Sequence, residues 1–182
     1  LTKVAVAFNN KCWFFDAKKL NLITQAELSA TIDAIQVSDT AYAVLLGGKV
    51  MLNYFDDSKK PFNFPDFDTN AKVTAFALTG FLLLLATDDG TVRIFNTRNQ
   101  AFLDGYKHQN AIISIKPNLS ETKFVFIDSA HGVFMFNPIK RITLEVTQEG
   151  TPIDAETALF DITDRNVFAV IAPRAVAVYH FT

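Results

Sequence analysis

The segment that decides the fold is Lys72–Asn137, which reads KVTAFALTGFLLLLATDDGTVRIFNTRNQAFLDGYKHQNAIISIKPNLSETKFVFIDSAHGVFMFN. It holds two units with the same order of features: an apolar strand, a turn, a more apolar strand, a turn containing Gly, and an alternating strand that ends in Phe and Asn. The first unit turns at Asp88–Gly90 and ends at Phe95–Asn96. The second turns at His131–Gly132 and ends at Phe136–Asn137. Such a repeat predicts architecture and does not by itself state a function.

The aromatic residue that ends each unit recurs along the whole chain. The positions are Phe15, Phe55, Phe95, Phe136 and Tyr179, at spacings of 40, 40, 41 and 43 residues. A polar residue follows each of them: Asp16, Asp56, Asn96, Asn137 and His180. A period of about 40–45 residues with about four short strands per unit is typical of β-propeller blades. We expect the repeated aromatic side chain to fill the gap between neighbouring blades.

The predicted fold is therefore all-β, a WD40-like β-propeller with about four and a half blades of a larger, roughly seven-bladed ring. We place the blades approximately at 1–28, 29–69, 70–107, 108–148 and 149–182, within one domain. The first unit lacks its first strand and the chain begins at Leu1 without a Met, so we expect a piece of a longer protein. A β-sandwich gives no reason for a fixed period, and a parallel α/β sheet needs helices that the pattern lacks.

Composition bounds the class of protein. The 182 residues are 49% hydrophobic and 20% charged, with 18 Phe, as in a globular chain with a sizeable core. A net charge of −2 argues against a nucleic-acid partner. The single Cys, Cys12, excludes an internal disulfide and a Cys-rich metal site. The longest apolar run, Gly80–Ala86, is far shorter than the ~20 residues that span a bilayer, so we expect no direct membrane insertion.

No group of residues has the spacing of a catalytic or metal site. The three histidines, His108, His131 and His180, form no ligand pair, and turn or capping roles are expected for them. Asp88–Gly90 lacks the spaced oxygen ligands of a calcium loop and is better explained as a hairpin turn. No nucleophile elbow, P-loop or dinucleotide fingerprint occurs. We therefore predict no catalytic residue, no cofactor and no metal.

The best candidate for a partner-binding site is the polar, Pro-containing stretch Asp56–Thr69. Pro61 and Pro65 do not suit a central strand, so the stretch is predicted to be a loop around one short edge strand. The aromatic residues Phe62, Phe64 and Phe67 are interleaved in it, and exposed aromatics in a loop can anchor a partner protein. The favoured alternative is that they simply pack over the edge of their own blade.

Basic doublets are a second, weaker candidate for a binding surface. They occur at Lys18–Lys19, Lys59–Lys60 and Lys140–Arg141, each just after a predicted strand. Solvated loops are the default explanation for them, ahead of a binding patch.

Four sequence motifs resemble those of a known family and occur in the same order as in that family. They are KFVFIDSAHGVFMF at 123–136, DGYKHQNAIISI at 104–115, AFNNKCWF at 7–14 and GKVML at 48–52. Together they resemble the second propeller of the WD repeat-containing protein 19 family, a core subunit of intraflagellar transport complex A. A sister subunit with the same plan remains an alternative.

The resemblance implies a non-enzymatic scaffold. It implies contacts with the other subunits of a hetero-oligomeric complex and with cargo adaptors, in retrograde ciliary transport and ciliary entry of membrane proteins. It also implies a location in the cytoplasm and cilium, at the cilium base and axoneme, in association with the cytoskeleton. The alternatives are a propeller of a vesicle coat or other trafficking scaffold, and a propeller-fold enzyme. An enzyme would need His and carboxylate side chains that converge on the central channel.

Overall fold

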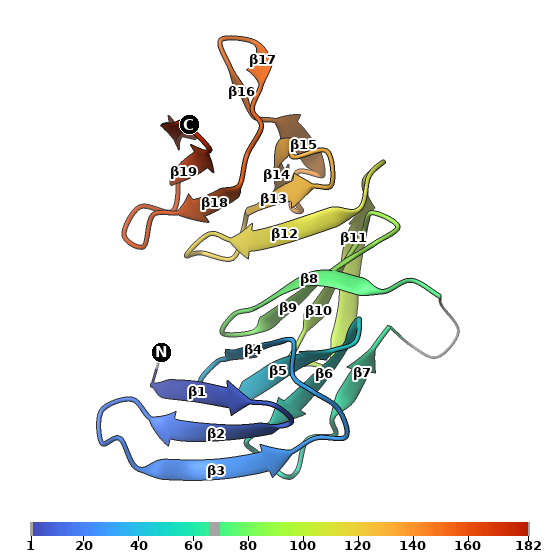
Figure 1. The fold of residues 1–182 in the computed structure, drawn as a ribbon, viewed down its shortest axis with the longest axis vertical. Coiled ribbons are helices and arrows are strands. Elements are labelled where there is room, and N and C mark those ends of the chain that lie inside the picture. Colours follow the sequence, from blue (N-terminus) through green and yellow to red (C-terminus); the bar gives the residue numbers. More distant parts are fainter. Residues whose placement is uncertain (1, 66–69, 182) are drawn as a thin grey trace. The chain divides into compact units, whose positions relative to one another are not determined.

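The computed structural model of the chain describes residues 2–65 and 70–181, and every regular element within these ranges is a β-strand (Figure 1). The predicted all-β class is thus confirmed. The chain divides into two compact units. Unit 1 comprises Leu1–Val73 and Leu78–Phe81, and unit 2 comprises Thr74–Ala77 and Leu82–Thr182. None of the described elements is a helix that could span a membrane.

Unit 1 holds two antiparallel sheets whose strands follow the chain order, β1-β2-β3 and β4-β5-β6-β7. The strands of the first sheet are β1 (Lys3–Phe8), β2 (Lys11–Asp16) and β3 (Leu22–Glu27). Those of the second are β4 (Ala34–Val37), β5 (Ala41–Leu46), β6 (Lys49–Tyr54) and β7 (Phe62–Phe64). The predicted short edge strand in the Asp56–Thr69 stretch is β7, which is confirmed as the last strand of its sheet.

Unit 2 contains two sheets of four strands, one of three, and a separate two-stranded hairpin. The first four-stranded sheet consists of β8 (Val73–Leu78), β9 (Leu82–Thr87), β10 (Thr91–Asn96) and β11 (Ala101–Lys107). The second consists of β12 (Ile112–Pro117), β13 (Phe124–Asp128), β14 (Val133–Asn137) and β15 (Ile142–Glu145). The hairpin is β16 (Thr147–Gln148) and β17 (Thr151–Pro152). The last sheet is β18 (Thr157–Phe160), β19 (Val167–Ala172) and β20 (Ala175–His180).

Glycines close the hairpins where the predicted turns require them. Gly47 and Gly48, between β5 and β6, both have positive φ, at 55° and 83°, which matches the tight turn that joins twisted antiparallel strands. Gly90, between β9 and β10, has φ 82°, and a Cβ there would lie 2.5 Å from the carbonyl oxygen of His108. Both the backbone conformation and the lack of space therefore demand Gly at position 90.

The core lies on the second strand of each four-stranded sheet in unit 2. Every residue of β9 and every residue of β13 is buried, which agrees with their apolar runs LLLLA and FVFI; each strand ends in a buried polar residue, Thr87 and Asp128. A strand covered on both faces has this composition, because neither face needs polar side chains. The sheets of unit 2 therefore pack face to face around these strands.

The repeated aromatic packs against the preceding sheet, as predicted, at three positions where both sheets belong to one unit. In unit 1, the ring of Phe55 lies 5.3 Å from that of Phe14 on β2. In unit 2, Phe136 stacks on Tyr106 of β11 at 4.9 Å. Tyr179 follows the same rule, since its ring packs on the core shared with β14 and its hydroxyl donates to the carbonyl of Thr147 at 3.3 Å.

Candidate functional site

The predicted aromatic site is only partly at the surface. Phe62 and Phe64 lie on the same face of β7 and their rings stack at 6.1 Å, while Phe67 lies outside the described residues. Phe64 pairs with Val50 across the sheet and is only 2% exposed, whereas Phe62 is half-buried. Phe64 is therefore buried in the fold, and Phe62 is the more exposed of the two rings. A partner-binding role for the three residues remains a prediction.

A buried polar pair joins the start of the β12 sheet to its second strand. The Nε2 atom of His108 lies 3.0 Å from Oδ2 of Asp128, and both side chains are almost fully buried. The Nδ2 group of Asn110 donates to the same oxygen at 2.8 Å. The other oxygen, Oδ1, accepts the backbone N–H groups of Ala130 at 3.0 Å and Gly132 at 2.9 Å. Both carboxylate oxygens are therefore fully used within the fold.

This pair corrects one expectation for the histidines. A turn or capping role for His108 is wrong, because its ring lies in the core, 4.5 Å from the ring of Phe134. His131 does sit in a turn, with φ 63° and its Nδ1 atom 3.2 Å from the carbonyl oxygen of Ala155. His180 ends β20 and is exposed. The three rings are held in different surroundings and share no site.

Hydrogen bonds set the charge state of Asp128. Burial acts to raise the pKa of Asp128, but the donors on Asn110, His108, Gly132 and Ala130 outweigh burial and leave that pKa below its ordinary value. The carboxylate is thus kept ionised by groups that also hold it in place. Such a group positions the β13–β14 turn and is closed to a substrate.

The lowered pKa of Asp128 predicts the response of this sheet to acid. Because the folded pKa lies below the unfolded one, ionised Asp128 stabilises the fold fully above the unfolded value of about 4, and this contribution is lost as the pH falls through the folded value. We expect the stability difference between the wild type and an Asp128→Asn variant to shrink below pH ~4. Hydrogen exchange of the full-length protein over a pH series, corrected for intrinsic exchange rates, would measure it. A difference that persists unchanged in acid would contradict this prediction.

The Asp88–Gly90 turn is held by its own side chains. The Thr87 hydroxyl donates to Oδ1 of Asp89 at 2.5 Å, and the Lys107 ammonium lies 2.9 Å from Oδ2. These two groups hold the pKa of Asp89 well below its usual range. The carboxylate therefore organises the hairpin, as predicted for this turn. Within residues 2–65 and 70–181, no three His, Cys, Asp or Glu side chains are grouped closely enough to hold a metal ion.

In four of the five repeats, the polar residue after the aromatic, an Asp or Asn, caps the turn that follows. Asp16 accepts the backbone N–H groups of Lys18 and Lys19 at 2.9 and 2.7 Å, and Asn137 accepts those of Ile139 and Lys140 at 3.0 and 3.1 Å. This is an Asx turn, in which the side chain replaces a backbone acceptor. It places the basic residues at the outside of the turn, where Lys18, Lys19 and Lys140 are exposed.

Comparison with known proteins identifies the family. Residues 1–182 match the family model described as the WDR19 second beta-propeller. Human WD repeat-containing protein 19 is 27% identical over 155 residues, which cover 80% of this chain and 12% of that protein. Caenorhabditis elegans WD repeat-containing protein dyf-2 is 22% identical over 161 residues, 86% of this chain and 12% of that protein. The chain thus spans only a small part of the length of these relatives.

Solved structures show the same fold at low sequence identity. The β-propeller domain of Myceliophteria thermophila Cps50 (Swd1) has a TM-score of 0.76 and 14% identity, with 98% of this chain and 66% of that chain covered. Kluyveromyces lactis Hsv2 has a TM-score of 0.75 and 13% identity, with 98% and 58% covered. The WD40-like propeller fold predicted from the repeat is confirmed. With the match over residues 1–182, the chain belongs to the WDR19 second β-propeller family.

Proposed function

We propose that the chain is a non-enzymatic scaffold propeller of a subunit of intraflagellar transport complex A. In this role it holds other subunits and cargo adaptors during retrograde ciliary transport and during ciliary entry of membrane proteins. The observation that carries the proposal is the family match over residues 1–182. The corresponding location is the cytoplasm and cilium, including the cilium base and axoneme, within a hetero-oligomeric complex.

The side-chain chemistry supports a scaffold. Asp128, the most buried carboxylate among residues 2–65 and 70–181, is fully hydrogen-bonded within the fold, and the carboxylates of Asp16 and Asp89 organise turns. A catalytic carboxylate or His needs a free position from which it reaches a substrate. These groups hold the loops in fixed positions instead, which is what a surface for protein contacts requires.

We further propose that the chain is part of a larger ring of about seven blades, with the blade limits given above. Two sheet faces support this proposal. Val4, Val6 and Phe8 are exposed on one face of β1, and Val176 and Val178 are exposed on one face of β20. Phe15 pairs with Val4 on the first of these faces, at the position that Phe55 and Phe136 use to pack on a preceding sheet. Further blades would cover both faces.

Substitution of Phe62 tests the partner-binding loop. In the full-length protein, Phe62→Ala is expected to reduce recovery of the other complex subunits by about tenfold, because an anchoring aromatic contributes on the order of 1–2 kcal/mol. Asn63→Ala is the matched control, since Asn63 is the next residue of β7 and its side chain points to the opposite face. Quantitative co-purification measures both variants. Equal recovery of the wild type, Phe62→Ala and Asn63→Ala would remove Phe62 from the site.

A further inference from the structure

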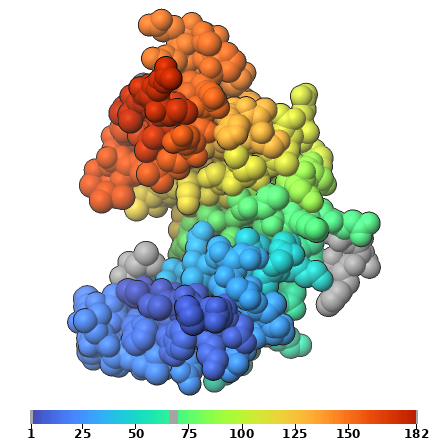
Figure 2. Space-filling view, viewed as in Figure 1, coloured from blue at the N-terminus to red at the C-terminus, as the bar shows by residue number. Residues whose placement is uncertain are grey.

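One connection in unit 2 is longer than its fold requires. The segment between β15 and β18 comprises residues 146–156, whereas the corresponding segment between β11 and β12 comprises only 108–111. The longer segment folds into the β16–β17 hairpin, which projects beyond the sheets of unit 2 (Figure 1). In the space-filling view its orange atoms form the upper tip of the unit (Figure 2). An ordered insertion of this kind is a candidate for a specific contact.

The base of the hairpin is fixed in the core. Val146 and Ala155, at its two ends, are buried. The N–H of Val146 donates to the carbonyl of Val133 at 2.8 Å, and the N–H of Ala155 donates to that of His131 at 3.0 Å. The Tyr179 hydroxyl adds a bond to the carbonyl of Thr147 at 3.3 Å. The hairpin is therefore anchored to the β13–β14 turn and to β20. Binding of a partner would not require the hairpin to become ordered.

The tip of the hairpin is exposed and tightly turned. Glu149 and Gly150 have φ values of 51° and 80°, the conformation that joins two strands through a two-residue turn. Every residue from Gln148 to Pro152 is exposed. The turn therefore presents the Glu149 carboxylate to solvent at a defined place.

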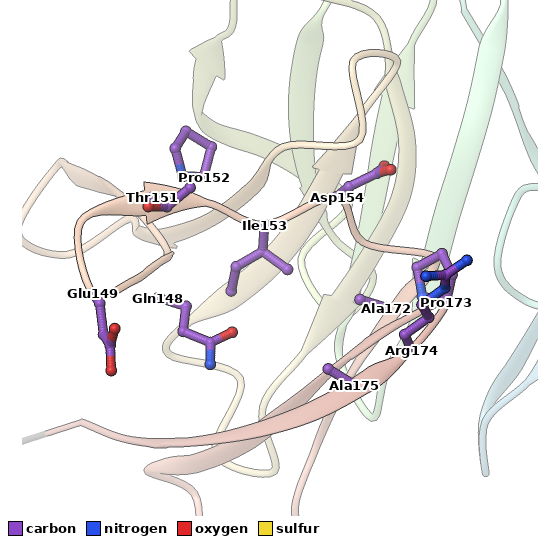
Figure 3. Close-up of a pocket in the computed structure, with 10 residues that line it drawn as sticks. All are labelled: Gln148, Glu149, Thr151, Pro152, Ile153, Asp154, Ala172, Pro173, Arg174 and Ala175. Carbon is purple, nitrogen blue, oxygen red and sulfur yellow. The ribbon is translucent and has the colours of Figure 1, made fainter.

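A pocket of about 540 Å³ lies between the hairpin and the β19–β20 turn. Figure 3 shows Ile153 between the hairpin turn at Glu149 and the opposite wall at Pro173 and Arg174. Ile153 is half-buried and packs on the core shared by β13, β14 and β19, so it offers a fixed apolar surface. The volume is within the range of known ligand sites and is large enough for a few side chains of a peptide ligand.

The charges of the hairpin select the kind of partner. Residues 146–156 contain three carboxylates, on Glu149, Asp154 and Glu156, and no Lys or Arg. This excess disfavours phosphate-rich partners such as nucleic acids and anionic lipids, and it favours a basic side chain. Arg174 on the opposite wall can donate to a backbone carbonyl or a carboxylate of the bound segment. The pocket thus combines an apolar surface with opposite charges at its rim.

We propose that this pocket binds an extended segment of a partner subunit, which places an apolar side chain on Ile153 and a Lys or Arg against Glu149. The proposal rests on the scaffold function proposed above and assigns a docking site for one partner. The hairpin is separate from the Phe62 loop, which belongs to unit 1. The two sites can therefore be tested independently.

The test uses overlapping synthetic peptides from the other complex subunits and measures their binding to the full-length protein by fluorescence anisotropy. At least one peptide with an apolar residue next to a Lys or Arg is expected to bind. Glu149→Lys is expected to weaken that binding about tenfold, because it reverses the charge that faces the Lys or Arg of the peptide. Glu149→Gln only removes that charge and is expected to weaken binding by a smaller factor. Glu156→Lys is the matched control, since Glu156 is exposed and makes the same change in net charge outside the pocket.

Two results would overturn the docking site. One is that no peptide binds, and the other is that Glu149→Lys and Glu156→Lys weaken binding equally, which would indicate a general charge effect. Co-purification of the wild-type protein with the other subunits separates this proposal from the scaffold function. If the subunits co-purify and either result is obtained, only the docking site is wrong. If they do not co-purify, both proposals fail.

Discussion

In the full-length protein, replacing Asp128 by Ala is expected to lower the free energy of opening of the β12–β15 sheet by about 3–5 kcal/mol. The variant removes the acceptor of four donors: His108, the Asn110 amide and the N–H groups of Ala130 and Gly132. Buried donors that lose their acceptor keep the full cost of leaving water. Native-state hydrogen exchange followed by mass spectrometry measures the opening free energy of this segment directly.

Asp104→Ala is the matched control for this variant. Asp104 is also a carboxylate with a cationic partner, Arg141. However, the side chains of Asp104 and Arg141 are both largely exposed. An exposed ion pair contributes roughly 0–1 kcal/mol, so the control is expected to change the opening free energy little. Equal effects of the two substitutions would contradict the structural role of the buried pair.

Replacing Phe136 by Ala is expected to cost about 3–5 kcal/mol, because the side chain is buried between two sheets of unit 2. Its ring stacks on Tyr106 at 4.9 Å and lies 6.3 Å from that of Phe124. The substitution leaves a cavity at the contact between the β8–β11 and β12–β15 sheets. Hydrogen exchange is therefore expected to accelerate in both sheets.

Phe102→Ala makes the same chemical change at a residue that is 45% exposed. It is expected to cost no more than about half as much, since part of the ring remains in water in the folded state. If Phe136→Ala and Phe102→Ala had the same effect, the repeated aromatic would not be a core contact between sheets. The repeat would then lose its physical explanation.

Much of the fold could be predicted from the sequence because its signals repeat. The aromatic at each unit end recurs at a nearly constant spacing, and the sheets place it at Phe55 and Phe136 against a preceding sheet. The Gly turns at Gly47–Gly48 and Gly90 follow from local backbone chemistry. The Asp or Asn after the aromatic is a regular feature of the sequence, and the structure explains it as an Asx turn.

The features that escaped prediction depend on contacts that occur only once. His108 and Asp128 are far apart in sequence and meet only after β12 and β13 pair, so no local pattern marks them. The β16–β17 hairpin has strands of two residues, too short for an alternating pattern. Phe62 and Phe64 share one face of β7, so the alternation of faces along a strand cannot predict that Phe64 is buried and Phe62 only half-buried.

The central claim is that this propeller acts by holding partner subunits. The most direct measurement is hydrogen exchange of residues 1–182 in the full-length protein, free and assembled with the other subunits of intraflagellar transport complex A. Slower exchange on assembly is expected at surface segments, first at β7 and at the β16–β17 hairpin, while the buried strands β9 and β13 stay unchanged. Exchange rates that are identical in the free and assembled protein throughout residues 1–182 would contradict the claim.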